Sequence, residues 1–280
     1  MGNFQGKGAQ RKVTQATWRG SKVAVKEFYR PPKHVMSTIM QEASLLFQLR
    51  KSENIVKLVG FCNSTMVFEY APITLKHLVL DKKEEMSVQR ALSLGLDVVK
   101  GIAQLHSIVD GPVVHADIHL EQYLVNSSGR VLLGDFHVSA YVGLDKSCEK
   151  KCSYTRDYYR ASWWAEMSHC APEMLSRGRD LDEKTDVYQV ALILWALRSR
   201  ESPYKNMERS ENEKILVPGG RERIIAGERP DLALMSDYPS ELKELIVEAW
   251  DTDPLKRPPA ANMVKRMEGI VLKYGQPAES

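Results

Sequence analysis

The stretch that decides the fold is His115-Ala116-Asp117-Ile118-His119-Leu120-Glu121-Gln122, and Gly134-Asp135-Phe136-His137 follows it. Two short apolar runs lie between these segments, Tyr123-Leu124-Val125 and Val131-Leu132-Leu133, and Ser128-Gly129 separates the runs. Apolar runs on either side of a Ser-Gly pair predict two short strands joined by a turn. Asp117 and Asp135, eighteen positions apart, flank these strands.

The residues before this stretch predict strands and one helix. Lys22-Val23-Ala24-Val25-Lys26-Glu27-Phe28 alternates and contains β-branched side chains, which is typical of a strand. Residues 35–50 have apolar side chains at helical spacing and no Gly or Pro, so they predict a helix. Ile55-Val56-Lys57-Leu58-Val59 and Met66-Val67-Phe68-Glu69-Tyr70 predict paired strands, with a turn at Asn63-Ser64.

The residues after about position 74 are predominantly helical in pattern. Ser87 can cap a long helix that runs to His106, and residues 182–273 predict several helices separated by Pro and Gly. The change near Ala71-Pro72 therefore predicts an α+β chain with a small β-rich part, residues 1–71, and a larger α-helical part, residues 72–280.

The composition is that of an ordinary globular protein. Of 280 residues, 43% are apolar and 27% are charged, and a chain of this length can bury a large core without a metal or a disulfide. A net charge of +3 does not indicate a nucleic-acid partner, and four cysteines are too few for a disulfide scaffold. The longest apolar run, residues 190–197, is far shorter than the ~20 residues of a membrane span, so we expect no such span.

The segments quoted above resemble the motifs of the eukaryotic protein kinase family, in the family's order and over essentially the whole chain. This resemblance implies a bilobal fold, in which a β-rich N-lobe and an α-helical C-lobe bind ATP and Mg²⁺ between them. Residues 6–13, Gly-Lys-Gly-Ala-Gln-Arg-Lys-Val, resemble the glycine-rich loop over the phosphates through Gly6 and Gly8. Val23-Ala24-Val25-Lys26 resembles the strand whose lysine holds the phosphates, and Glu42 on the next helix is its expected partner.

The resemblance also assigns catalytic roles within residues 115–122. Asp117 stands where the family has the carboxylate that accepts or orients the proton of the substrate hydroxyl. His119 takes the position of a lysine that helps to neutralise the γ-phosphate, and a neutral imidazole offers one hydrogen bond without a full charge. Ala116 replaces the usual arginine, so switching through a phosphorylated activation segment should be weak or absent.

Two further residues take the metal-binding positions of the family. Asp135 keeps the oxygen ligand of the Asp-Phe-Gly motif, in which His137 replaces the glycine. Gln122 stands where an asparagine belongs, and its amide oxygen is displaced by one methylene, roughly 1.5 Å. A displacement of about 1 Å can cost ~100-fold in rate, so we expect low or atypical activity.

The resemblance implies an adenine pocket and three structural residues. Val13 and Ala24 would lie above the adenine ring and Leu124 below it, while the backbone from Glu69 to Ala71 would bind its edge. In the family, the residues corresponding to Glu173 and Arg257 form a buried ion pair, and the residue corresponding to Asp186 anchors the catalytic loop. The motifs that place these three residues are Cys170-Ala171-Pro172-Glu173, Lys184-Thr185-Asp186-Val187-Tyr188 and Trp250-Asp251…Asp253-Pro254…Arg257-Pro258.

We therefore expect an ATP- and Mg²⁺-dependent kinase that phosphorylates a serine or threonine hydroxyl of a protein. One alternative is a pseudokinase that binds nucleotide or a protein partner, because Arg11, His119, Gln122 and His137 all depart from the family pattern near the phosphates. The second is a secretory-pathway kinase similar to the protein O-mannose kinases, a resemblance carried by Gly8-Ala9, Gly60-Phe61-Cys62, Thr65-Met66, Glu69-Tyr70 and Gln122-Tyr123-Leu124. We expect a cytoplasmic location, whereas the sequons at Asn63 and Asn126 would suit a secretory lumen.

Overall fold

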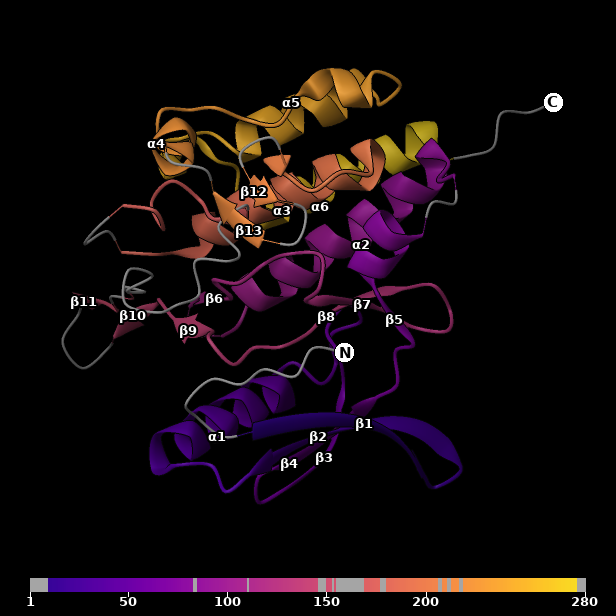
Figure 1. The fold of residues 1–280 in the computed structure, drawn as a ribbon, viewed down its shortest axis with the longest axis vertical. Helices are drawn as coiled ribbons and strands as arrows, with labels where there is room; N and C mark the ends of the chain where they lie inside the picture. Colours follow the sequence, from indigo (N-terminus) through magenta and orange to yellow (C-terminus); the bar gives the residue numbers. More distant parts are fainter. Residues whose placement is uncertain are drawn as a thin grey trace.

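A computed structural model describes residues 10–82, 85–109, 111–145, 150–152, 154, 169–176, 180–205, 208–210, 213–216 and 219–275. The described residues form a β-rich N-terminal part and a helical C-terminal part, which lie at opposite ends of the molecule in Figure 1. This arrangement confirms the predicted α+β, two-lobed class. The proposed boundary after residue 71 falls in the connection between strands β4 and β5.

The N-terminal part consists of one antiparallel sheet and one helix. Its elements are β1 (Gln10–Trp18), β2 (Ser21–Tyr29), α1 (Lys33–Gln48), β3 (Leu58–Cys62) and β4 (Thr65–Glu69). The strands lie in the order β1-β2-β4-β3, and α1 packs next to β3. The helix buries Ile39, Ala43 and Leu46 together with Glu42, so a carboxylate lies among its apolar contacts.

The register of the sheet places three predicted site residues on one face. Lys26 on β2 lies opposite Val13 on β1 and opposite Met66 on β4. Directly opposite residues of an antiparallel pair share a face, and so do residues two positions apart on one strand. Val13, Ala24 and Lys26 therefore lie on the same face of the sheet.

The predicted strand at residues 55–59 is wrong in its bounds. The strand β3 begins only at Leu58, while Ile55 makes an isolated parallel bridge with Leu133 in the C-terminal part. The backbone N–H of Val56 donates to the carbonyl of Leu133 at 2.9 Å, and Ile55 is buried. Periodicity alone does not separate a sheet strand from a short buried connection, and this apolar run is such a connection between the two parts.

The C-terminal part contains the remaining elements. They are β5 (Ile73–Thr74), η1 (His77–Asp81), α2 (Val88–His106), β6 (Val113–Val114), β7 (Tyr123–Val125), β8 (Val131–Leu133), β9 (Ala140–Tyr141), β10 (Leu144–Asp145), β11 (Lys150–Lys151), α3 (Glu183–Ser199), β12 (Glu208–Ser210), β13 (Glu213–Leu216), α4 (Gly220–Ile225), η4 (Leu232–Met235), α5 (Ser240–Ala249), η5 (Pro254–Lys256) and α6 (Ala260–Tyr274).

The helix α3 is the centre of this part. Every residue from Thr185 to Leu197 is buried, and α3 packs against α2 and α5, while α2 packs against α6. A helix that is buried on all sides lies in the interior of a protein. The hydroxyl of Ser87 accepts from the backbone N–H of Arg90 at 3.2 Å, which confirms the predicted start of α2. No helix in the described ranges is long and apolar enough to span a membrane.

The two short strands of the deciding stretch pair as predicted. The strands β7 and β8 are antiparallel, with Tyr123 opposite Leu133 and Val125 opposite Val131. Gly129 has a φ of 81° in the connecting turn, a left-handed conformation that glycine adopts without strain. The hairpin places Asp117 before one end of β7 and Asp135 after the adjoining end of β8, near the junction of the two parts.

Candidate functional site

A buried lysine joins the two parts of the molecule. The Lys26 ammonium nitrogen lies 3.2 Å from both carboxylate oxygens of Glu42 and 2.9 Å from one oxygen of Asp135. Lys26 is 7% exposed and Glu42 is 2% exposed, so the pair is formed largely out of contact with water. The Lys26–Glu42 ion pair is the one that the sequence predicts, and it connects β2, α1 and the segment after β8.

The segment after β8 is held in a strained conformation. Asp135 has a φ of 58°, which is uncommon for a residue with a side chain and costs of order 1–2 kcal/mol. Next to it, Phe136 is 2% exposed and contacts the His115 ring edge-on, with 5.1 Å between the ring centroids. The His115 ring donates through Nε2 to the carbonyl of Gly134 at 3.0 Å, and burial lowers the pKa of His115. These contacts hold the Asp135 carboxylate towards Lys26.

The backbone before Asp117 is fixed by a buried aspartate in the first turn of α3. One oxygen of Asp186 accepts from the backbone N–H of His115 and the other from that of Ala116, each at 2.8 Å. The His106 ring contacts Asp186 as well, at 2.8 Å. Ala116 has a φ of 60°, so the carboxylate of Asp186 holds a strained residue directly before Asp117. This geometry confirms the anchoring contact predicted for Asp186.

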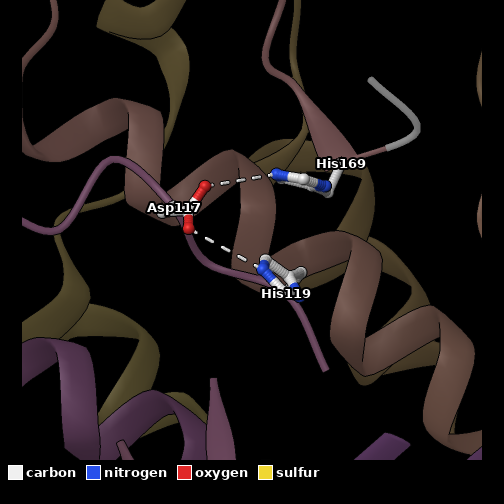
Figure 2. A group of neighbouring side chains, drawn as sticks. All are labelled: Asp117, His119 and His169. Carbon is white, nitrogen blue, oxygen red and sulfur yellow. Dashed lines mark ion pairs between the residues drawn. The ribbon is translucent and has the colours of Figure 1, made fainter. Parts of the chain in front are cut away.

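Asp117 lies between two imidazole rings and an amide. Its oxygen Oδ2 accepts from Gln122 Nε2 at 2.8 Å and lies 3.8 Å from His119 Nε2, while Oδ1 lies 3.7 Å from His169 Nε2 (Figure 2). Burial acts to raise the pKa of Asp117, but the two imidazoles outweigh it and hold this pKa well below its usual value. Asp117 is therefore ionised at neutral pH.

The residues predicted to bind a metal ion offer hard oxygen donors. Because Gln122 donates its amide nitrogen to Asp117, its amide oxygen is the atom left to act as a ligand. Asp135 supplies carboxylate oxygens, one of which already contacts Lys26 and His137 Nδ1, the latter at 3.2 Å. Amide and carboxylate oxygens are the ligands that Mg²⁺ prefers, so this donor set fits a magnesium ion.

The residues predicted to bind the nucleotide are only partly within the described ranges. Gly6 and Gly8 lie outside the described residues. Val13 is 57% exposed, whereas Ala24 and Leu124 are half-buried. Glu69 is the last residue of β4, and its backbone N–H donates to the carbonyl of Lys57 at 3.0 Å. Ala71 lies in the connection between β4 and β5, which joins the two parts.

The predicted structural ion pair is present and buried. Arg257 donates to the two carboxylate oxygens of Glu173 at 2.7 and 2.9 Å, and the two residues are 1% and 4% exposed. Thr185 also donates to Glu173, at 3.0 Å. The pair ties the segment around residues 170–175 to the turn before α6.

His169 is a site residue that the sequence did not reveal. It precedes Cys170-Ala171-Pro172-Glu173, and no local pattern distinguishes it from an ordinary polar residue. The His169 ring lies tilted against the His119 ring, with 4.8 Å between the ring centroids. Its Nε2 faces Oδ1 of Asp117, the carboxylate oxygen that His119 does not face. Only the tertiary fold brings it to the catalytic loop, since 52 positions separate it from Asp117.

Comparisons with known proteins agree with this geometry. Residues 2–267 match the family model described as protein tyrosine and serine/threonine kinase. The chain is 31% identical over 276 residues to a Dictyostelium discoideum protein named "Probable serine/threonine-protein kinase drkC", with 96% of this chain and 34% of that protein covered. It is 30% identical over 270 residues to serine/threonine-protein kinase 12 of Arabidopsis thaliana, with 93% and 54% covered.

A third relative carries a broader name. The chain is 27% identical over 285 residues to the dual specificity protein kinase shkB of Dictyostelium discoideum, with 95% of this chain and 40% of that protein covered. The chain thus spans about one third to just over one half of the length of these three relatives.

Proposed function

This chain belongs to the protein tyrosine and serine/threonine kinase family, and from that premise we propose that it transfers the γ-phosphate of ATP to a serine or threonine hydroxyl of a protein substrate. The relatives named above support a protein kinase, and two of the three are named as serine/threonine kinases. The proposal includes the identity of the acceptor, of the nucleotide and of the metal ion, as well as the rate of transfer.

The observation that carries the proposal is the position of the Lys26 ammonium between Glu42 and Asp135. The three groups come from β2, α1 and the segment after β8, and the contacts are 3.2 and 2.9 Å long. In this family a lysine paired with a helix glutamate positions phosphates, and phosphoryl transfer depends on positioning and electrostatics more than on covalent chemistry. A preformed, buried pair supports a site that is ready to hold a triphosphate.

Asp117 is the group that would receive the acceptor hydroxyl. Its lowered pKa keeps it ionised at neutral pH, so its oxygens accept the hydroxyl hydrogen bond and orient the attacking oxygen. His119 would donate a hydrogen bond towards the transferred group, but a neutral ring supplies no full positive charge. We therefore expect slower turnover than a lysine at this position would give.

The metal ion would be held by the carboxylate of Asp135 and the amide oxygen of Gln122, and it would supply positive charge to the phosphates. The chain's own groups do the remaining positioning. Val13 and Ala24 share the sheet face of Lys26, which suits an adenine ring on that side of the site.

One observation favours a pseudokinase as the second candidate. The Gln122 amide hydrogen-bonds to Asp117 at 2.8 Å, and its longer side chain sets the ligand oxygen about one methylene away from the family position. A chain with this change could bind nucleotide and still fail to transfer phosphate. A transfer assay separates the two candidates directly.

The acceptor is tested with γ-labelled ATP, Mg²⁺, and a mixed panel of serine, threonine and tyrosine peptides together with an O-mannosyl glycan. We expect label on serine or threonine after acid hydrolysis, and no transfer by Lys26→Met. Lys57→Met serves as the matched control, since Lys57 is an exposed lysine of the same lobe.

Three results would contradict the proposal. Label on tyrosine alone would exclude the serine/threonine assignment. Label on the sugar alone would favour the glycan kinase. Saturable binding of ATP with no labelled product on the whole panel would favour the pseudokinase.

A further inference from the structure

The two imidazoles around Asp117 and the carboxylate itself form a group with the composition of a transition-metal site. Asp117, His119 and His169 each direct one possible ligand atom at the others, and these three atoms lie within 4.8 Å of one another. Figure 2 shows the two rings next to each other on one side of the carboxylate, each facing a different oxygen. Two histidines and one carboxylate are the ligand set of one class of catalytic zinc sites.

We propose that Asp117, His119 and His169 bind a Zn²⁺ ion, and that the bound ion inhibits phosphoryl transfer by occupying the Asp117 carboxylate. The binding part stands on geometry alone. The inhibitory part rests on the proposed kinase function.

The ligand atoms lie somewhat farther apart than those of a tetrahedral zinc site. With bonds of about 2.0–2.1 Å, two ligands of such a site lie about 3.3 Å apart. The observed separations are 3.8 Å from Asp117 Oδ2 to His119 Nε2 and 3.7 Å from Asp117 Oδ1 to His169 Nε2, and the three possible ligand atoms lie within 4.8 Å of one another. With one oxygen of Asp117 as the ligand, the separations must therefore close by up to about 1.5 Å, which side-chain rotation can supply.

The surroundings of the three ligands suit a metal with an open coordination position. The side chains are 13%, 13% and 11% exposed, for Asp117, His119 and His169 in turn, so an ion can reach them from solvent. Both rings, but not Asp117, also line a cavity of about 60 Å³, which is large enough for water. Gln122 already donates to the Asp117 carboxylate at 2.8 Å, as outer partners of metal-bound carboxylates do.

Binding has one local cost. His119 Nδ1 accepts from the backbone N–H of Glu121 at 3.4 Å, and a metal ion on Nε2 requires Nδ1 to carry the proton instead. A contact of 3.4 Å is long for a hydrogen bond, so little stabilisation is lost with it. Imidazole nitrogen selects Zn²⁺ over Mg²⁺, so this site and the oxygen ligands of Asp135 and Gln122 would take different ions.

The binding test uses Co²⁺, whose visible absorption reports tetrahedral coordination, on untagged protein in the absence of nucleotide. We expect the parent to develop this absorption with one equivalent of Co²⁺ and to lose it when Zn²⁺ is added. His169→Asn and His119→Lys should each weaken Zn²⁺ binding by at least about tenfold in competition with a chelating dye. The matched control is His34→Asn, because His34 is an exposed histidine of α1.

A thermal melt of each variant establishes that it is folded. Because the two variants change different ligands, the test remains valid if one of them unfolds. Equal Co²⁺ absorption in the parent and in both ligand variants would overturn the proposal and leave the rings as hydrogen-bonding neighbours of Asp117. Strong near-ultraviolet charge-transfer bands would also overturn it, because they indicate a cysteine ligand.

The inhibition test compares phosphate transfer with and without added Zn²⁺ for each variant. We expect Zn²⁺ to lower kcat in the parent and in His34→Asn without raising the KM for ATP, and to have at least about tenfold less effect in His169→Asn. Zn²⁺ binding at the predicted ligands without any inhibition of an active parent would overturn the inhibitory part. A parent that binds Co²⁺ at these ligands but shows no transfer at all would contradict the kinase function and leave the metal site in place.

Discussion

At the scale of single residues, Asp117 is the centre of the proposed active site. Its carboxylate contacts Gln122 at 2.8 Å and faces His119 and His169 at 3.8 and 3.7 Å. The imidazoles lower its pKa in spite of burial, and the neighbouring Ala116 is held at a φ of 60° by Asp186. The proposed catalytic carboxylate is thus ionised and fixed in direction before any substrate arrives.

The lowered pKa of Asp117 predicts a pH dependence of stability. Because the folded pKa lies below the unfolded value of ~3.9, the ionised carboxylate stabilises the fold at higher pH, and this contribution is lost as the pH falls through the folded pKa. As the pH falls from about 5 to about 3, the free energy of unfolding should therefore decrease less in Asp117→Asn than in the parent. Urea denaturation of both proteins across this pH range measures the free energy of unfolding. An equal decrease in the two proteins would contradict the lowered pKa of Asp117.

Gln122 predicts a gain of function. The side chain of Gln122 is one methylene longer than the asparagine of the family. If its amide oxygen binds the metal ion, Gln122→Asn should return this oxygen to the family position and preserve or raise phosphate transfer. The measurement is kcat at saturating ATP and Mg²⁺. A large loss of activity would show that the chain has adapted to glutamine and uses another ligand set.

At the scale of elements, the segment that ends at Glu173 is tied to the turn before α6 by a buried ion pair. Arg257 is 1% exposed and also donates to the carbonyl oxygens of Asp251 and Lys184, each at 2.8 Å. Removal of one partner leaves a buried charge without its counter-ion, which costs about 3–5 kcal/mol. Arg257→Met should therefore lower the free energy of unfolding by about this amount.

The matched control for this change is Arg266→Met. Arg266 also pairs with a glutamate, Glu248, but the pair lies at the surface, where such pairs contribute about 0–1 kcal/mol. Chemical denaturation of both variants gives the comparison. Equal losses of stability would show that burial does not decide the strength of these pairs.

The elements were predictable where the pattern is local. The Ser87 cap and the strands at 123–125 and 131–133 follow from capping, short apolar runs and turn chemistry, while the Lys26–Glu42 pair follows from the resemblance to the kinase family. The strand at 55–59 was misplaced because a buried apolar connection has the same short pattern as a strand. His169 could not be predicted, since its place at Asp117 depends on the tertiary fold.

At the scale of the whole molecule, the candidate site lies between the two parts, and Lys26 of the N-terminal part contacts Asp135 of the C-terminal part at 2.9 Å. A ligand that contacts both parts stabilises the folded state by mass action, by about 2.7 kcal/mol at one hundred times its Kd. We therefore expect a non-hydrolysable ATP analogue with Mg²⁺ to raise the free energy of unfolding in the parent.

Lys26→Met should largely abolish this stabilisation, because the phosphates lose their cation. Lys57→Met should keep it. Denaturation with and without the nucleotide measures the effect in all three proteins. Nucleotide that leaves the stability of the parent unchanged would argue for a module that only binds proteins.

The most direct test of the central claim is phosphate transfer from γ-labelled ATP by Asp117→Asn beside the parent, with the ATP affinity of each measured in parallel. We expect the variant to bind ATP with nearly the parent's affinity and to lose transfer by about 100-fold or more. Asp81→Asn, which changes an exposed aspartate of η1, should transfer as the parent does. Turnover by Asp117→Asn at the parent's rate would contradict the role of Asp117 and with it the proposed active site.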